Sequence, residues 1–161
     1  MSQPHKAKHK GRVVILDTDR LLLRQLTVED AAFILRLVND ADWLRHIGDK
    51  NVHSLEDAQA YLRNGPLAMY AKFGHGLWLV LRKTDRRPMG MCGLIKRDSL
   101  PDVDIGFAFL PEFRSQGYAR EAAAATLLYA QQKLGLRRVV AITSPANLAS
   151  IRLLEKLGLR N

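Results

Sequence analysis

Runs of apolar residues along the chain follow two patterns, which predict strands and helices respectively. Short apolar or alternating runs predict strands over residues 21–26, 77–82, 88–96, 103–110 and 138–143. Apolar positions at helical spacing predict helices that begin near residues 27 and 54, and others over 117–134 and 147–157. The order β-α-α-β-β-β-α-β-α predicts an α/β (α+β) fold, in which a mixed, mostly antiparallel sheet has helices on both faces.

The first two helices carry matching start signals. Thr27 and Ser54 each stand three residues before an aspartate, Asp30 and Asp57, as in a capping box. The second helix should end at Gly65-Pro66, because proline has no backbone N–H to continue the helical ladder.

The lengths of the connections predict the directions of the strands. The strands between residues 77 and 110 are joined by short turns, so they should be antiparallel. The helix over 117–134 instead crosses over to the strand over 138–143, which should lie parallel to the strand over 103–110. A ligand groove is expected outside the carboxyl ends of this parallel pair.

The crossover helix begins at an arginine-glycine-alanine turn, within the stretch FLPEFRSQGYAREAAAA over 109–125. Unpaired N–H groups and the macrodipole at a helix start favour an anion. Gly117 and Ala119 would let a large polyanion approach the backbone, and Arg114 would add a positive charge beside it. The turn therefore predicts a diphosphate site, with a purely structural turn as the alternative. It is neither a P-loop nor a three-glycine dinucleotide fingerprint.

A second strand-to-helix turn, Ser144-Pro-Ala-Asn147, lies further along the chain, and its asparagine either caps a helix or contacts a ligand. Together the two turns resemble the GNAT superfamily of acyl-CoA-dependent N-acyltransferases, whose signature Gln/Arg-x-x-Gly-x-Gly/Ala matches Arg114, Gly117 and Ala119. The resemblance runs from about Thr18 to the C-terminus and includes the element order and the Asn-x-Ala-Ser…Leu-Gly ending. It is greatest to the branch of ribosomal-protein N-terminal (RimJ/RimL-type) acetyltransferases.

This resemblance implies that the fourth and fifth predicted strands splay apart and admit the pantetheine arm of acetyl-CoA, the co-substrate. Backbone groups at the end of the fourth strand would pair with the arm, as an added strand pairs with a sheet edge. Amides across Ser115–Ala119 would hold the diphosphate, and Asn147 would contact the pantetheine or the acetyl end. The coenzyme-binding residues so implied are Phe109, Leu110, Arg114, Ser115, Gln116, Gly117, Tyr118, Ala119 and Asn147.

The chain also departs from the family pattern. Many members place a general-acid tyrosine seven positions after the asparagine, where this chain has Leu154. Ser150 is then the nearest group able to hydrogen-bond the departing thiolate, unless it only satisfies backbone groups. The family continues with two further strands after the position of Gly158, whereas this chain stops at Asn161. With those strands missing, an open sheet edge is expected, which another subunit of a homodimer could cover.

The proposed chemistry needs a base and an acceptor pocket. An α-amine, with a pKa of about 7.7–8.0, demands less of a base than a lysine amine at about 10.4. Asp104 is the candidate base or amine-orienting group, because alternation places it on one strand face with Gly106 and Ala108; the alternative is an exposed acid at a strand start. The candidate acceptor-lining residues, on or near the first two helices, are Trp43, His46, Tyr61, Tyr70 and Trp78.

Composition and charge narrow the classes of function. A length of 161 residues with 47% hydrophobic content fits one domain. The net charge of +9 is partly local, because residues 1–12 hold Lys6, Lys8, Lys10 and Arg12 and no acid. They are expected to form a basic disordered tail before a single domain over 13–161. The charge also permits nucleic-acid or ribosome binding, but aromatic residues are only 7% of the chain and form no stacking motif.

Other features exclude further classes. No apolar run approaches the roughly 20 residues of a membrane span, and no signal-peptide pattern opens the chain, so a cytoplasmic protein is expected. The single Cys92 is expected in a buried strand, and His46 and His53 have no metal-ligand spacing, so no metal is predicted. The favoured function is acetyl-CoA-dependent acetyl transfer to a primary amine, of a protein N-terminus or a small molecule, by direct attack in a ternary complex. The alternatives are a nucleic-acid or ribosome-binding protein and a GNAT-fold protein that binds coenzyme without turnover.

Overall fold

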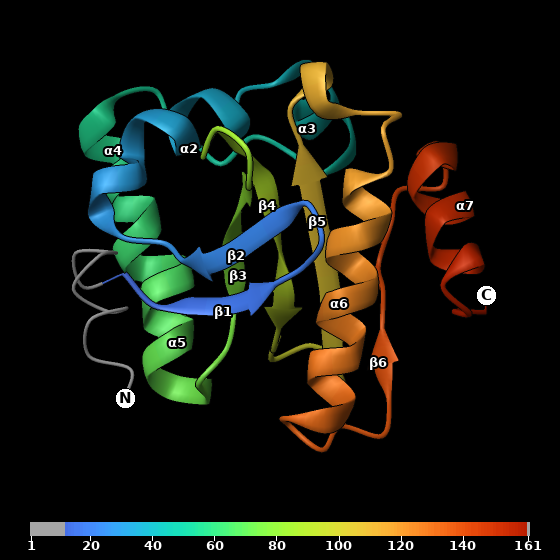
Figure 1. The fold of residues 1–161 in the computed structure, drawn as a ribbon. Coiled ribbons are helices and arrows are strands. Elements are labelled where there is room, and N and C mark those ends of the chain that lie inside the picture. Colours follow the sequence, from blue (N-terminus) through green and yellow to red (C-terminus); the bar gives the residue numbers. More distant parts are fainter. Residues whose placement is uncertain (1–11, 161) are drawn as a thin grey trace.

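The described residues, 12–160, form one six-stranded sheet in the computed structural model, with the strands in chain order (Figure 1). The strands are β1 (Val14–Asp17), β2 (Leu21–Gln25), β3 (Leu77–Arg82), β4 (Pro88–Ile95), β5 (Val103–Phe109) and β6 (Val139–Val140). Each neighbouring pair from β1 to β5 is antiparallel, and β5 and β6 are parallel. The mixed, mostly antiparallel sheet predicted from the connection lengths is therefore confirmed.

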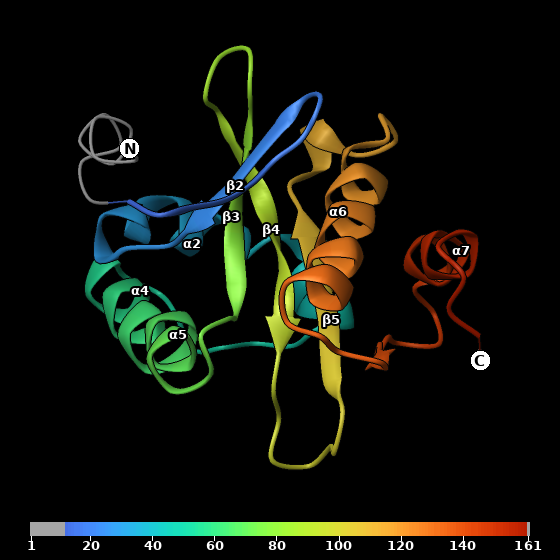
Figure 2. The ribbon, with the colours of Figure 1, turned by 60° about the horizontal axis from the view of Figure 1, so that its bottom comes forward.

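Helices cover both faces of this sheet. They are η1 (Val28–Asp30), α2 (Ala31–Leu37), α3 (Ala41–His46), α4 (Leu55–Leu62), η2 (Arg63–Leu67), α5 (Ala68–Phe73), η3 (Pro111–Phe113), α6 (Tyr118–Gln132) and α7 (Leu148–Lys156). Figures 1 and 2 show α2, α4 and α5 together on one side of the sheet and α6 on the other. On the α6 side, Trp78 of β3 packs edge-on against Tyr129, with ring centroids 5.4 Å apart.

Both predicted helix starts are confirmed as caps. The Thr27 hydroxyl accepts from the amide of Glu29, and the Asp30 carboxylate accepts from the amide of Thr27 at 2.8 Å. Ser54 Oγ accepts from the amide of Asp57 at 3.0 Å. Asp30 also binds the buried guanidinium of Arg24 through two hydrogen bonds of 2.9 and 2.8 Å, so the first cap also anchors the following helix to β2.

Three elements differ from the prediction. β1 is absent from it, because its three half-buried residues and exposed Asp17 give no clear alternation. α3 lies between the helices predicted to begin near residues 27 and 54, where no element is predicted. The α4 helix does not end at Gly65-Pro66 but continues through the π-helical turn η2 into α5, which ends at Gly74 in the left-handed region. A π turn is wider than an α turn, and this accommodates a proline that lacks an N–H.

The parallel pair separates almost as soon as it forms. Val139 and Val140 pair with Val103 and Asp104 at the start of β5, and from Ala141 onward the chain leaves the sheet. The strand predicted over 138–143 is therefore much shorter than expected, and the splay that the family resemblance implies is present. This separation creates the space in which the candidate site lies.

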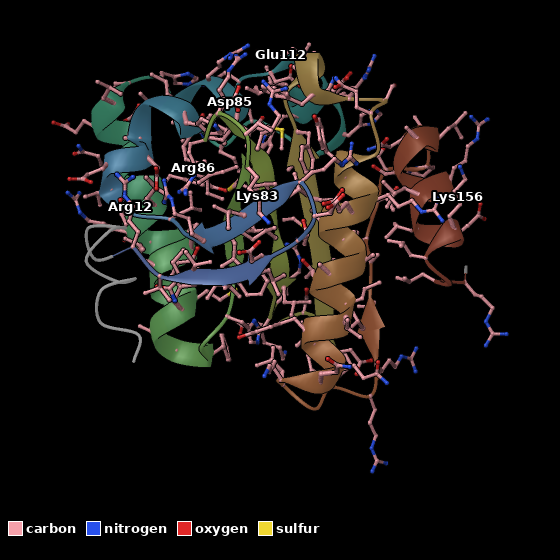
Figure 3. The ribbon with its side chains drawn as sticks, in the orientation of Figure 1. Arg12, Lys83, Asp85, Arg86, Glu112 and Lys156 are labelled. Atoms are coloured by element: carbon pink, nitrogen blue, oxygen red, sulfur yellow. The ribbon has the colours of Figure 1, made fainter. Side chains whose placement is uncertain are left out.

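The basic tail predicted over residues 1–12 lies outside the described residues except for Arg12. The guanidinium of Arg12 pairs with Glu29 at 2.8 Å, on the side of the molecule where η1 and α2 begin (Figure 3). Between residues 12 and 160, no helix combines the length and the apolar character that a membrane crossing requires.

Candidate active site

A cavity of about 280 Å³ lies where β5 and the segment after β6 separate. One wall is β5 from Asp104 to Ala108, and residues 141–144 and the start of α7 face it. The α3, α4 and η2 helices supply the remaining wall, including Trp43 and Tyr61. The crossover therefore places a groove at the parallel pair, as the strand directions predict.

Asp104 is buried in the wall of this cavity, with only 2% of its side chain exposed. Its Oδ2 accepts a hydrogen bond from Arg97 Nε at 2.7 Å. Burial raises the pKa of Asp104 above its ordinary value, and the bonds from Arg97 and the Ile142 amide offset only part of the rise. The alternative of an exposed acid at a strand start is therefore wrong. A carboxylate with a raised pKa is better matched to accepting a proton near neutral pH.

Three residues of α7 and its N-cap line the cavity. Asn147 caps this helix, its Oδ1 accepting from the Ser150 amide at 3.3 Å, so its predicted capping role is confirmed. The Asn147 Nδ2 group and the Ser150 hydroxyl have no hydrogen-bond partner within residues 12–160. Leu154, 7% exposed, occupies the position where many family members have tyrosine, and its side chain cannot donate a proton.

The turn before α6 has the backbone geometry of an anion site. Gly117 is the N-cap of this 15-residue helix with φ +84°, and no side chain caps the helix. Within the described chain, the amides of Ser115–Ala119 donate to no protein acceptor. A Cβ at Gly117 would lie 3.2 Å from Arg20 Nη2 in a backbone conformation that disfavours side chains. Unpaired amides at a helix start attract anions such as phosphates.

The guanidinium beside this turn belongs to Arg20, a residue that no motif in the sequence indicates. It lies 4.4 Å from the ring centroid of Tyr118, and its Nη1 donates to the Gln116 carbonyl at 3.0 Å. Glu121 holds Arg20 in place through Nε at 2.7 Å and through its backbone amide at 2.8 Å. No local spacing could have indicated Arg20, because it reaches the turn from the connection between β1 and β2.

Arg114, which is expected beside a diphosphate, is bonded to protein groups instead. Its guanidinium bonds the carboxylates of Asp40 and Asp42 at 2.8 and 2.5 Å. It also donates twice to the Phe109 carbonyl, at 3.0 and 2.7 Å. Arg114 therefore joins the end of β5 to the start of α3.

The sheet register shows that the backbone groups of β5 that face the splay differ from those expected at Phe109 and Leu110. The Leu110 amide donates to the Met89 carbonyl at 2.9 Å, so it points toward β4 and away from the coenzyme groove expected for it. Antiparallel alternation then directs the backbone groups of Phe107 and Phe109 toward the β6 side. The Phe109 carbonyl is already bound by Arg114, which leaves the Phe107 groups and the Phe109 amide at the splay.

The five predicted acceptor-lining residues divide into two groups. Trp43, His46 and Tyr61 line the cavity. Tyr70 and Trp78 do not: the Tyr70 hydroxyl is held by the Leu26 amide and the Leu77 carbonyl, and Trp78 is fully buried in the core. Both aromatic rings pack against other side chains of the protein. Composition alone cannot distinguish such packing from contact with a ligand.

Cys92 lies on the α6 side of the sheet, outside the cavity lining. It is fully buried in β4, as predicted, with its Sγ 3.4 Å from Thr126 Oγ1. Burial raises the pKa of its thiol to about 12, and the Thr126 contact offsets this only partly, so the thiol is not activated. Among the residues that the structure describes, no group of three histidine, cysteine or acidic side chains could hold a metal ion.

A family model described as an acetyltransferase (GNAT) domain matches residues 20–160, nearly the whole described chain. The chain belongs to the GNAT acetyltransferase family. It is 32% identical over 145 residues to the uncharacterized N-acetyltransferase YoaA of Bacillus subtilis, a match that covers 89% of this chain and 81% of YoaA. The acetyltransferase assignment that the two turn motifs suggest is therefore confirmed.

Solved structures share the fold of this acetyltransferase. A GNAT-family acetyltransferase from Bacillus anthracis superposes with a TM-score of 0.75 at 27% identity, covering 92% of this chain and 84% of that one. RimL, a ribosomal L7/L12 alpha-N-protein acetyltransferase solved in complex with coenzyme A, superposes with a TM-score of 0.74 at 16% identity, covering 90% and 82%. At that identity, the likeness to RimL shows a common fold alone.

Proposed function

We propose that this acetyltransferase moves an acetyl group from acetyl-CoA to a primary amine, of a protein N-terminus or a small molecule, in a ternary complex. Two observations carry the proposal: the unpaired amides at Ser115–Ala119, which follow the end of β5, and the buried Asp104, which lies in the splay cavity beside the same strand. The unpaired amides fit the coenzyme's linked phosphates, and the buried Asp104 fits the deprotonation of an amine.

The residues of the turn fit a coenzyme diphosphate. Ser115–Ala119 offer backbone N–H donors, and Arg20, whose charge is paired with Glu121, has its Nη2 nitrogen without a partner among the described residues and able to donate beside them. The Phe107 backbone and the Phe109 amide are the groups that would pair with a pantetheine arm entering the splay. Asn147 Nδ2, which its capping role does not use, would donate to the inner end of the arm.

The coenzyme, when bound, supplies an activated acetyl thioester. Asp104 would orient the acceptor amine and take its proton, which its raised pKa favours. The Ser150 hydroxyl would donate a hydrogen bond to the departing sulfur, because Leu154 cannot. Apolar side chains such as Met91 and Ile105 exclude water from the reacting groups.

Leu154 also favours one competing function, a GNAT-fold protein that binds coenzyme without turnover. The aliphatic side chain removes the proton donor that many family members place there, and only the shorter Ser150 is close enough in the sequence to replace it. This alternative predicts coenzyme affinity with no acetylated product.

The proposal is tested by calorimetric titration with acetyl-CoA, followed by mass spectrometry of an acceptor panel of N-terminal peptides, amino acids, polyamines and aminoglycosides. We expect binding, and acetylation of at least one acceptor with release of free thiol. Binding without product from any acceptor would support the non-catalytic alternative, and no binding would contradict both.

A further inference from the structure

One face of the sheet forms part of the cavity lining beside the buried carboxylate. Leu77 of β3 pairs with Gly93 of β4, which pairs with Gly106 of β5, so these residues form a row across three strands. In the neighbouring row, Ile95 of β4 pairs directly with Asp104 of β5. Because paired residues and alternate residues of a strand share a face, all of these residues lie on the same face of the sheet.

Side chains of the neighbouring strands close over the glycine of β5. A Cβ at Gly106 would lie 3.2 Å from Ile95 Cδ1 and 3.6 Å from Leu77 Cδ2. Met91 and Ala108, which pair with each other, extend the same face toward the end of β5. Each of these residues lines the cavity. We name Leu77, Met91, Ile95, Gly106 and Ala108 the apolar floor.

The apolar floor lies across β5 from the coenzyme groove. The backbone groups left for a pantetheine arm, at Phe107 and Phe109, point along the sheet toward β6. The floor extends the other way, from β5 over β4 to β3. Trp78 packs against Tyr129 of α6, so alternation directs Leu77 to the opposite face, which carries α2, α4 and α5 (Figures 1 and 2). The floor is therefore on the acceptor side of β5.

The cavity offers an acceptor one buried negative charge. Asp104 is the only acidic side chain among the described residues that line the cavity. The lysine and the arginine of the lining, Lys50 and Arg97, are exposed and add positive charge. A second ammonium that entered the cavity would lose hydration without gaining a carboxylate, which is costly. The lining therefore suits an acceptor with a single amine.

We propose that the apolar floor binds an aliphatic side chain next to the acceptor's reacting amine, so that the acceptor is an apolar monoamine. This rests on the proposed function, which places the amine at Asp104. Because Ile95 pairs with Asp104 and reaches over Gly106, an amine at the carboxylate has its substituent beside these residues. Burial of the substituent against the floor removes apolar surface of both from water. Polyamines and aminoglycosides bring further ammonium groups for which the lining has no carboxylate.

Matched acceptors test this directly. L-norleucinamide and L-lysinamide have side chains of similar length, but the second ends in an ammonium, and glycinamide has no side chain. We expect kcat/KM for acetylation at the α-amine to be at least about tenfold higher for norleucinamide than for either, after correction for the fraction of neutral α-amine. Tenfold corresponds to the burial of roughly two methylene groups.

The same comparison in peptides distinguishes two sources of the aliphatic group. Tripeptide amides that begin with norleucine, lysine or glycine and continue with two alanines carry the same three side chains at a peptide N-terminus. A preference for norleucine in either series supports the proposal. The series with the higher kcat/KM indicates whether the acceptor is a protein N-terminus or a small molecule.

Variants connect the preference to the apolar floor. Ile95→Thr keeps the branched shape but adds a hydroxyl, and Gly106→Ala adds a methyl group against Ile95 and Leu77. Each should reduce the preference for norleucinamide over glycinamide severalfold, mainly by raising KM for norleucinamide. Val13→Thr is the matched control, because Val13 is exposed and does not line the cavity.

Two results would overturn the proposal. One is a norleucinamide preference that is absent from the wild-type protein, or equal in Ile95→Thr, Gly106→Ala and Val13→Thr. The other is a change in the preference between acetyl-CoA and propionyl-CoA in Ile95→Thr and Gly106→Ala with no change between acceptors. That result would place the acyl group, rather than the acceptor, on the floor.

Binding separates this proposal from the proposed function. Norleucinamide and lysinamide are titrated into the wild-type protein and Ile95→Thr in the presence of coenzyme A, and the NMR shift of the Gly106 amide reports Kd. If no amine is acetylated, the proposed function fails, yet tighter binding of norleucinamide that Ile95→Thr weakens still supports the apolar floor. Equal Kd values of the wild-type protein for the two compounds contradict it.

Discussion

The guanidinium of Arg114 is hydrogen-bonded to the carboxylate of Asp40, with 2.8 Å between Nη2 and Oδ2. Asp40 also caps α3, accepting from the amides of Asp42 and Trp43. Since Arg114 holds the Phe109 carbonyl as well, it connects the end of β5 to the helix that carries Trp43. Arg114 of the turn motif therefore positions the cavity wall that contains Trp43.

The Arg114→Gln variant should lose about 1–3 kcal/mol of unfolding free energy, because it removes charge-assisted hydrogen bonds from two carboxylates that remain partly buried. Displacement of α3 should also raise KM for the acceptor more than Kd for acetyl-CoA. Urea denaturation and steady-state kinetics measure the two effects. Arg137→Gln, at an exposed arginine, is the control. Unchanged stability with a selective loss of acetyl-CoA affinity would instead indicate that Arg114 binds the coenzyme's diphosphate.

The Asp104→Asn variant should reduce kcat by about 100-fold or more, since it removes the proposed proton acceptor while preserving its shape. In the wild-type protein, kcat should fall as pH decreases through the raised pKa of Asp104, and in the variant this limb should be absent. If kcat of the variant equals that of the wild type from acid to alkaline pH, Asp104 does not accept the proton in the reaction.

The same substitution should not destabilise the fold at pH 7.5. Because burial raises the pKa of Asp104, the native state holds its proton more tightly than the unfolded state. The unfolding free energy therefore falls as pH rises from the ordinary pKa through the raised one, and it stays lower above that window. Asparagine avoids this loss, so thermal unfolding should show a Tm equal to or above that of the wild type.

Glu121→Gln should destabilise the protein by about 1–3 kcal/mol at pH 7. Burial raises the pKa of Glu121, but hydrogen bonds from Thr18 and Arg20 outweigh it and leave the pKa below its ordinary value. This stabilisation is present above the unfolded pKa and is lost as pH falls through the lowered native pKa. Urea denaturation from pH 7 to pH 3 should show the two proteins converging. Glu56→Gln, in the first turn of α4, is the matched control.

Ser150→Ala should lower kcat by about tenfold without changing stability. The cap of α7 uses the backbone amide of Ser150, which alanine retains, whereas the hydroxyl is the proposed donor to the leaving sulfur. Asn147→Ala should instead cost about 1 kcal/mol of stability through loss of the cap. Thermal unfolding and initial rates distinguish the two variants. Full activity in Ser150→Ala would leave that side chain with a structural role only.

Features that depend on neighbouring residues could be predicted from the sequence. The caps at Thr27 and Ser54 and the glycine turn at Gly117 need only local geometry, and each is confirmed. The continuation of the α4 helix past Pro66 depends on a wider π turn, for which the sequence has no simple signal.

Partners of long side chains could not be predicted in this way. A guanidinium reaches several ångströms from its backbone, so tertiary packing decided that Arg20 reaches the turn and that Arg114 reaches α3. Alternation along the strand predicts the face that carries Asp104, but only the fold shows that it is buried against Arg97.

The proposed function requires that the backbone amides before and at the start of α6 bind the coenzyme's diphosphate. This binding can be measured by NMR from the amide chemical shifts of residues 115–119, during titration with acetyl-CoA and separately with S-acetylpantetheine, which lacks the diphosphate. We expect large shifts of these amides with acetyl-CoA and little change with S-acetylpantetheine. Amides that shift with neither compound, or equally with both, would contradict it.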